Sequence, residues 1–208
     1  MALWRYDKGR INGAPFIYFG AELMPSGEAP PSLVKYALDT LDALSWRWGP
    51  THIEVRMTTH GPRLIEVNAG RCNGLDFRLL AELCYGYSAF DATAEAFLSP
   101  DDGFPQLPPL PPERLECHAR LVTLVSHVSG RVAGLRHLDE IGRMSTVLSF
   151  EPEAAEGDTI RHTTCLNTCA GTALMAHRDR ALLAKEYTRL RQLQNTLFEV
   201  EPSSFPEV

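Results

Sequence analysis

The sequence has few cysteines, no long apolar run and no surplus of basic residues. Its five cysteines are odd in number and scattered along 208 residues, a pattern that favours free thiols over a disulfide framework. No apolar stretch approaches ~18 residues and the N-terminus has no hydrophobic signal region, so we expect a soluble, cytoplasmic protein without a membrane partner. The formal net charge of −6 and the lack of a basic block argue against a nucleic acid as partner.

The common catalytic signatures are absent as well. The chain has no Ser or Cys nucleophile motif, no Gly-rich Lys-Ser phosphate loop and no dinucleotide fingerprint. Cys165 and Cys169 lie near His162, but without a second close pair small free thiols are a better interpretation than a zinc site. For His127 and His137 we favour structural roles, since no acid or nucleophile stands at a spacing that would orient either imidazole.

The remaining candidate for a functional site is the segment 52–68. Its apolar and polar residues alternate on both sides of a turn containing Gly61, which predicts a β-hairpin with residues 59–61 as its loop. Side chains of a strand alternate between the two faces of the sheet, so the odd positions should form an apolar face directed at the core, with Arg63 as its exception. The apolar residues of that face are Ile53, Val55, Met57, Ile65 and Val67.

The polar face of this hairpin pairs two acids. Counting back from the loop places Glu54 opposite Glu66 and His52 opposite Asn68. Two carboxylates with Cβ atoms ~5 Å apart weaken a sheet unless a cation lies between them. That cation is either a basic side chain such as Arg56 or a divalent metal ion, for which Asn68 supplies a further oxygen ligand.

Glu54, the twelve-residue step to Glu66 and the run Leu64-Ile-Glu-Val-Asn-Ala resemble the metal-binding end of ATP-grasp enzymes. That family includes biotin carboxylase, carbamoyl-phosphate synthetase and the amino-acid ligases. The resemblance implies that Glu54, Glu66 and Asn68 hold Mg²⁺ ions, with Mn²⁺ as an alternative, and that these ions bridge the phosphates of ATP. It favours the metal over the basic side chain.

Two further site residues follow from the same resemblance. Many family members have an arginine two residues after the asparagine, whereas here Arg71 follows Asn68 with one residue more. The resemblance implies that Arg71 stabilises an acyl-phosphate intermediate or orients a substrate carboxylate. It also makes Lys8 or Arg5 a candidate contact to phosphate or substrate; the alternative, which the residues themselves favour, is a solvated charge on an edge strand.

The predicted elements give an α+β fold. Residues 1–98 should form the C-terminal portion of an ATP-grasp module, with an antiparallel sheet covered by helices. The proline-rich segment 99–113 predicts a linker, because proline stiffens the chain and excludes a helix. Residues 114–208 alternate short strand patterns with a closing helix, which predicts a small α+β C-terminal domain.

The resemblance implies an ATP- and Mg²⁺-dependent carboxylate-amine ligase that acts through an acyl phosphate. Its partners would be a small-molecule carboxylate and an amine. Because the resemblance covers only the latter half of such an enzyme, we expect the chain to be inactive alone and to meet an N-terminal ATP-grasp half or to form a homo-oligomer. The alternative is a residual, non-catalytic module for binding or assembly, for which a polar and self-contained surface would be expected.

Overall fold

The computed structural model describes residues 1–72 and 74–201, with the side chains of residues 75, 76 and 104 left out. The fold is α+β, as expected, and the chain divides into two compact units. The first unit comprises Met1–Leu3 and Leu23–Leu115, and the second comprises Trp4–Glu22 and Glu116–Val208. Residues 4–22, which the sequence patterns grouped with the first unit, therefore lie in the second.

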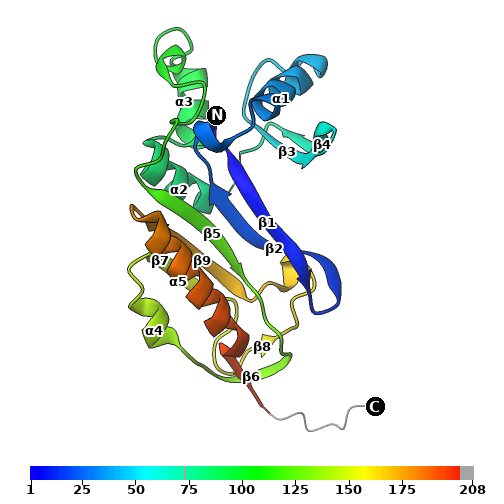
Figure 1. Cartoon of the computed structure of the whole chain (residues 1–208), viewed down its shortest axis with the longest axis vertical. Helices are drawn as coiled ribbons and strands as arrows, with labels where there is room; N and C mark the ends of the chain where they lie inside the picture. The colour runs from blue at the N-terminus through cyan, green and yellow to red at the C-terminus, as the bar shows by residue number, and fades with distance from the viewer. Residues whose placement is uncertain (73, 202–208) are drawn as a thin grey trace. The chain divides into compact units, whose positions relative to one another are not determined.

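Among its described residues, the first unit contains one hairpin and three α-helices. Its elements are 3₁₀-helix η1 (Ser26–Glu28), α1 (Pro31–Ala43), strands β3 (Thr51–Thr58) and β4 (Gly61–Ala69), α2 (Leu75–Tyr85), α3 (Ala89–Leu98) and 3₁₀-helix η2 (Phe104–Gln106). Strands β3 and β4 pair only with each other in the described sheets, and α1 packs against both (Figure 1). The hairpin is thus a separate two-stranded ribbon.

The ends of these helices follow local sequence signals. Ser88 caps α3 through a capping box in which Asp91 accepts a hydrogen bond from the Ser88 backbone. Gly86 ends α2 in the left-handed conformation, with φ of 80°, which costs glycine little. The first helix of the unit, α1, begins at Pro31, because proline suits the first helical position.

The second unit is built on a five-stranded sheet with the order β1-β2-β5-β9-β7. Its strands are β1 (Trp4–Ile11), β2 (Ala14–Leu23), β5 (His118–Leu124), β9 (Gly171–His177) and β7 (Val147–Pro152). A smaller sheet has the order β10-β6-β8, from β10 (Phe198–Val200), β6 (Gly130–Leu135) and β8 (Thr159–Ile160). The remaining elements are α4 (Leu138–Gly142), η3 (Leu166–Thr168), α5 (Arg180–Leu193) and η4 (Gln194–Thr196).

Glycine allows β2 to join this sheet. Gly20 pairs with Val122 of β5, and a Cβ atom at Gly20 would collide with the carbonyl oxygen of Leu121. Its φ of +134° is also a conformation that side-chain-bearing residues rarely adopt. The close approach of the two backbones brings a strand from the start of the chain beside one that follows it by about a hundred residues.

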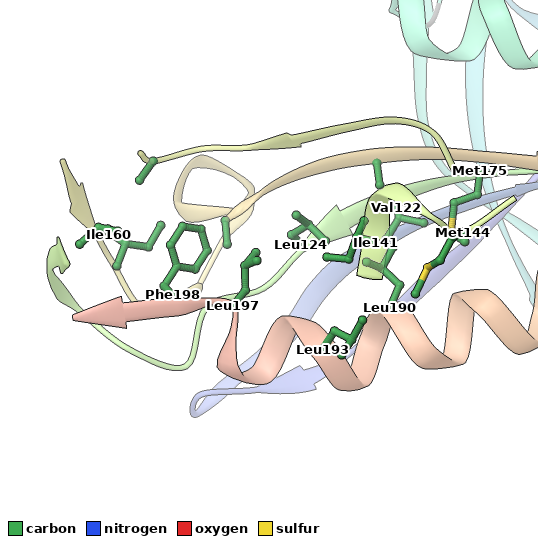
Figure 2. Packing of buried hydrophobic residues seen from close by; sticks show 14 of the residues in the cluster. Val122, Leu124, Ile141, Met144, Ile160, Met175, Leu190, Leu193, Leu197 and Phe198 are labelled. Carbon is green, nitrogen blue, oxygen red and sulfur yellow. The ribbon is translucent and has the colours of Figure 1, made fainter. Parts of the chain in front are cut away.

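The hydrophobic core of the second unit lies between its large sheet and helix α5. Figure 2 shows Leu190 and Leu193 of α5 beside side chains of β5 and of α4. Burial of this kind is worth about 1.5–3 kcal/mol for each large apolar side chain, so this cluster is a large favourable contribution to the stability of the unit. The labelled members are Val122, Leu124, Ile141, Met144, Ile160, Met175, Leu190, Leu193, Leu197 and Phe198.

Within the described part of the chain, none of the helices has the length and apolar character needed to cross a membrane.

Candidate metal centre

The polar face of the β3–β4 hairpin brings the predicted metal ligands together. Glu54 lies directly opposite Glu66, and His52 lies directly opposite Asn68, as the sequence predicted. Cross-strand partners of an antiparallel pair project from the same face. Glu54, Glu66 and Asn68 therefore share one face of the hairpin.

The loop of the hairpin differs from the prediction. Thr58 pairs with Gly61, so the loop consists of residues 59 and 60, and the predicted three-residue loop is wrong. A β-bulge between Glu54 and Val55 then shifts the register by one residue and leaves Ile65 without a direct partner. The two offsets cancel at the glutamates, which is why their predicted pairing is still correct.

The bulge also changes which side chains share a face near the loop. Val55 pairs with Leu64 and Met57 pairs with Pro62, so these residues continue the apolar face. Arg63, expected on the apolar face, pairs with Arg56 and therefore lies on the polar face. An arginine pair thus follows the glutamate pair along the hairpin toward its loop.

The apolar face of the hairpin is less buried than expected. Ile53 and Val55 are half-buried, but Leu64 and Ile65 keep 41% and 58% of their surface exposed. The Tyr36 hydroxyl of α1 accepts a hydrogen bond of 3.0 Å from the Leu64 backbone N–H. The prediction that this face is core is wrong, because α1 covers it only in part.

The donor atoms of the site are close together. One ligand atom from each of His52, Glu54 and Glu66 lies within 4.8 Å of the others. The amide nitrogen of Asn68 donates a 2.8 Å hydrogen bond to Glu66 Oε1, which orients both side chains. Glu66 is exposed whereas His52 and Glu54 are half-buried, so the group is accessible from solvent on the Glu66 side.

His52 is the member of this group to which the sequence patterns assigned no role. Its register opposite Asn68 already placed it on the polar face, and that was the signal that could have identified it. In the part of the chain that the structure describes, His52, Glu54 and Glu66 form the one group of three such residues close enough to hold a metal ion. Cys165, Cys169 and His162 do not form one, and no disulfide bond joins any of the five cysteines.

Arg71 follows the end of β4 and its side chain is exposed. The chain turns at Gly70, whose φ of +77° is left-handed and whose N–H donates a 2.8 Å hydrogen bond to the Pro50 carbonyl. This hydrogen bond continues the ladder of the hairpin by one residue. The additional residue before Arg71 is therefore the glycine that makes this turn.

Lys8 and Arg5 lie on β1 in the second unit. The Lys8 ammonium is 4.8 Å from the centroid of the Tyr6 ring, a cation–π distance. Arg5 donates to the carboxylate of Glu22, which is buried and also accepts a 2.8 Å hydrogen bond from Arg120. Arg5 is thus held by an internal acid rather than being a fully solvated charge.

The two histidines weighed as catalytic candidates take part in hydrogen bonds to residues far away in the sequence. His127 Nδ1 lies 2.9 Å from Asn12 Oδ1, and its Nε2 lies 3.1 Å from Asn195 Oδ1. His137 Nε2 lies 2.9 Å from the Thr196 hydroxyl. These contacts join separate segments of the second unit and give both histidines a structural role.

No protein-family model matches the chain. The chain is 26% identical over 199 residues to dapdiamide A synthase from Enterobacter agglomerans, across 95% of this chain and 46% of that protein. Its fold is similar to that of an L-amino acid ligase from Bacillus licheniformis, with a TM-score of 0.73 and 18% identity over 95% of this chain and 47% of the other. It is also similar to a phosphoribosylglycinamide synthetase from Anaerococcus prevotii, with a TM-score of 0.65 and 13% identity over 95% and 49% of the two chains.

The chain spans about half the length of these proteins. The match to dapdiamide A synthase includes nearly all of the sequence, and the structural matches cover the same share of the fold. The hairpin with its paired glutamates lies within the matched length, since 95% of the chain is covered. This chain is therefore similar in sequence and in fold to about half of a ligase of this kind, and its hairpin carries the residues that resemble the metal-binding end of ATP-grasp enzymes.

Proposed function

We propose that the chain is the metal-binding part of an ATP- and Mg²⁺-dependent carboxylate-amine ligase. In this reaction ATP phosphorylates a small-molecule carboxylate, and an amine attacks the acyl phosphate to form a C–N bond. The observation that carries the proposal is the direct pairing of Glu54 with Glu66, beside Asn68, in a chain related to dapdiamide A synthase. A solved structure with the same fold is an L-amino acid ligase.

The donor set fits a hard divalent cation. Carboxylate and amide oxygens are the ligands that Mg²⁺ takes in proteins, and it commonly uses one or two carboxylates together with substrate phosphates. Glu54, Glu66 and Asn68 present these oxygens on one face, and the Asn68 N–H group holds Glu66 in place. When bound, Mg²⁺ would neutralise the phosphate charge that shifts during transfer.

Cationic side chains would bind the anionic substrates. Arg71 is exposed just beyond the hairpin, where a guanidinium can hold a carboxylate or an acyl phosphate by two parallel hydrogen bonds. Lys8 and Arg5 are the candidates for a second anion contact. Arg5 is already oriented by Glu22, so little side-chain freedom would be lost when it binds.

The distribution of apolar residues supports the proposal that this chain is part of a larger enzyme and that another polypeptide segment covers some of its surface. Most large apolar side chains that are exposed in the described chain belong to the first unit, among them Trp48 at 70%, Phe97 at 63% and Leu98 at 82%. Most of the buried apolar core belongs to the second unit. Where exposed apolar side chains lie side by side, they mark a surface that contacts another polypeptide. We propose that an N-terminal ATP-grasp half covers the first unit, in the same chain or in another.

The test is a calorimetric titration of Mg²⁺-ATP into this chain, repeated with the N-terminal portion of dapdiamide A synthase added in trans. We expect weak or no binding by this chain alone, because half a cleft leaves the phosphates solvated and each charge contact weak. Binding should appear with the added portion and should be lost in Glu66→Gln. Micromolar binding by the chain alone would contradict the need for a partner, and binding insensitive to Glu66→Gln would contradict the metal site.

A residual binding or assembly module is the second candidate. The free thiols and the absence of a nucleophile motif are compatible with it, but the exposed apolar surface of the first unit is not the polar, self-contained surface that such a module would have. A chain that binds neither Mg²⁺ nor ATP under any of these conditions would favour this second function.

A further inference from the structure

His52 extends the oxygen donors of the hairpin with a nitrogen donor. It lies on β3 two residues before Glu54 and directly opposite Asn68, so the four side chains form a block of two cross-strand pairs on one face. Two ligands on opposite sides of one ion are about 4.2 Å apart when each bond is about 2.1 Å long. The donor atoms of His52, Glu54 and Glu66 lie within 4.8 Å of one another. This distance is therefore near the span of a single coordination shell.

The chemistry of these donors favours a particular class of ion. Carboxylates and amides suit Mg²⁺ and Mn²⁺ alike, whereas imidazole suits first-row transition ions better than Mg²⁺. We infer that His52 is a nitrogen ligand of the hairpin site and makes that site select Mn²⁺ over Mg²⁺. The inference rests on the proposed function only in placing the metal at the hairpin.

The position of His52 supports a ligand rather than a surface role. Its side chain is half-buried, and so is that of Glu54, while Glu66 is exposed. An ion bound here would be approached by solvent or by phosphate oxygens from the Glu66 side, and His52 would occupy the inner side of its coordination shell. A hydrogen bond from the imidazole to a carboxylate is the competing explanation, and it predicts no preference between the two ions.

The experiment is electron paramagnetic resonance of Mn²⁺ added to this chain, with Mg²⁺ as competitor. Spin-echo modulation from an imidazole ¹⁴N reports nitrogen ligation directly. The variant is His52→Gln, and the matched control is His60→Gln, because His60 is exposed in the loop of the same hairpin. We expect the ¹⁴N signal in the unsubstituted chain and in His60→Gln, and its loss in His52→Gln.

We expect His52→Gln to lower the Mn²⁺ affinity by about tenfold or more, the usual effect of losing a group that holds or orients a metal ligand. The Mg²⁺ affinity should change by less than about twofold, since Mg²⁺ takes oxygen ligands. Three results would overturn the inference: no Mn²⁺ binding in the millimolar range, a ¹⁴N signal that persists in His52→Gln, or equal losses of both affinities. If Glu66→Gln abolishes binding of both ions while His52→Gln changes neither, the inference fails and the proposed metal site stands.

Discussion

Glu22 pairs with three arginines of the second unit. Its replacement tests the structure, because the expected loss in the free energy of unfolding can be worked out from these contacts. The carboxylate accepts hydrogen bonds from Arg5, from Arg120 at 2.8 Å and from Arg180 at 3.5 Å. Glu22 is 8% exposed and the Arg120 side chain is 20% exposed, with its guanidinium 4.4 Å from the centroid of the Tyr187 ring. The pair between Glu22 and Arg120 is therefore largely desolvated.

Glu22→Gln removes the charge that balances these guanidiniums but keeps an acceptor oxygen. Breaking a buried ion pair typically costs 3–5 kcal/mol, so we expect the free energy of unfolding to fall by about 3 kcal/mol. Arg5 and Arg180 are 54% and 47% exposed, and solvent screening keeps their contribution below about 1 kcal/mol each. For a unit of this size the expected loss corresponds to a Tm lower by roughly 12 °C.

The measurement is urea unfolding followed by circular dichroism, with Glu140→Gln as the matched control. Glu140 binds Arg189 at the surface through two hydrogen bonds, so its replacement should leave the midpoint within the error of the measurement. The double variant Glu22→Gln/Arg120→Met should recover part of the stability, because it also removes the unbalanced buried charge. The reasoning is refuted if Glu22→Gln unfolds like Glu140→Gln, or if the two substitutions in the double variant are additive.

Three further predictions use local features of the chain. Ser88→Ala should lower stability by about 1 kcal/mol through loss of the α3 cap. Hydrogen bonding from Ser88 lowers the pKa of Asp91. The contribution of this cap to stability is therefore fully present above the ordinary aspartate pKa and is lost as the pH falls through the lowered pKa. Unfolding of the variant and of the unsubstituted chain across this acid range would check this. Limited proteolysis should cut first within 99–113, and early cuts between 30 and 98 would contradict a linker there. Hydrogen bonding from Thr168 lowers the pKa of the exposed Cys165, so this thiol should be alkylated first near neutral pH, and Thr168→Val should slow its reaction; equal rates in mass spectrometry would disprove this.

The sequence alone determined the hairpin and the pairing of its glutamates. Alternation of apolar and polar residues specifies which residues share a face, because side chains of a strand have a period of two. Glu54 and Glu66 were correctly placed opposite each other. The loop was wrong by one residue and Arg63 was placed on the wrong face, since a bulge inserts a residue without a local sequence signal as clear as that of a turn.

The tertiary structure decided which distant segments share a sheet and which charges share a site. Residues 4–22 form strands β1 and β2, but the pairing of β2 with β5 depends on non-local contacts that a local pattern does not specify. The three arginines around Glu22 come from β1, β5 and α5, so only the folded chain brings them together. For His52, the sequence decided one property and the structure another. The face of the hairpin on which His52 lies follows from the period of the strand. That its donor atom lies within 4.8 Å of a donor atom of each glutamate could be seen only in the three-dimensional structure of the hairpin.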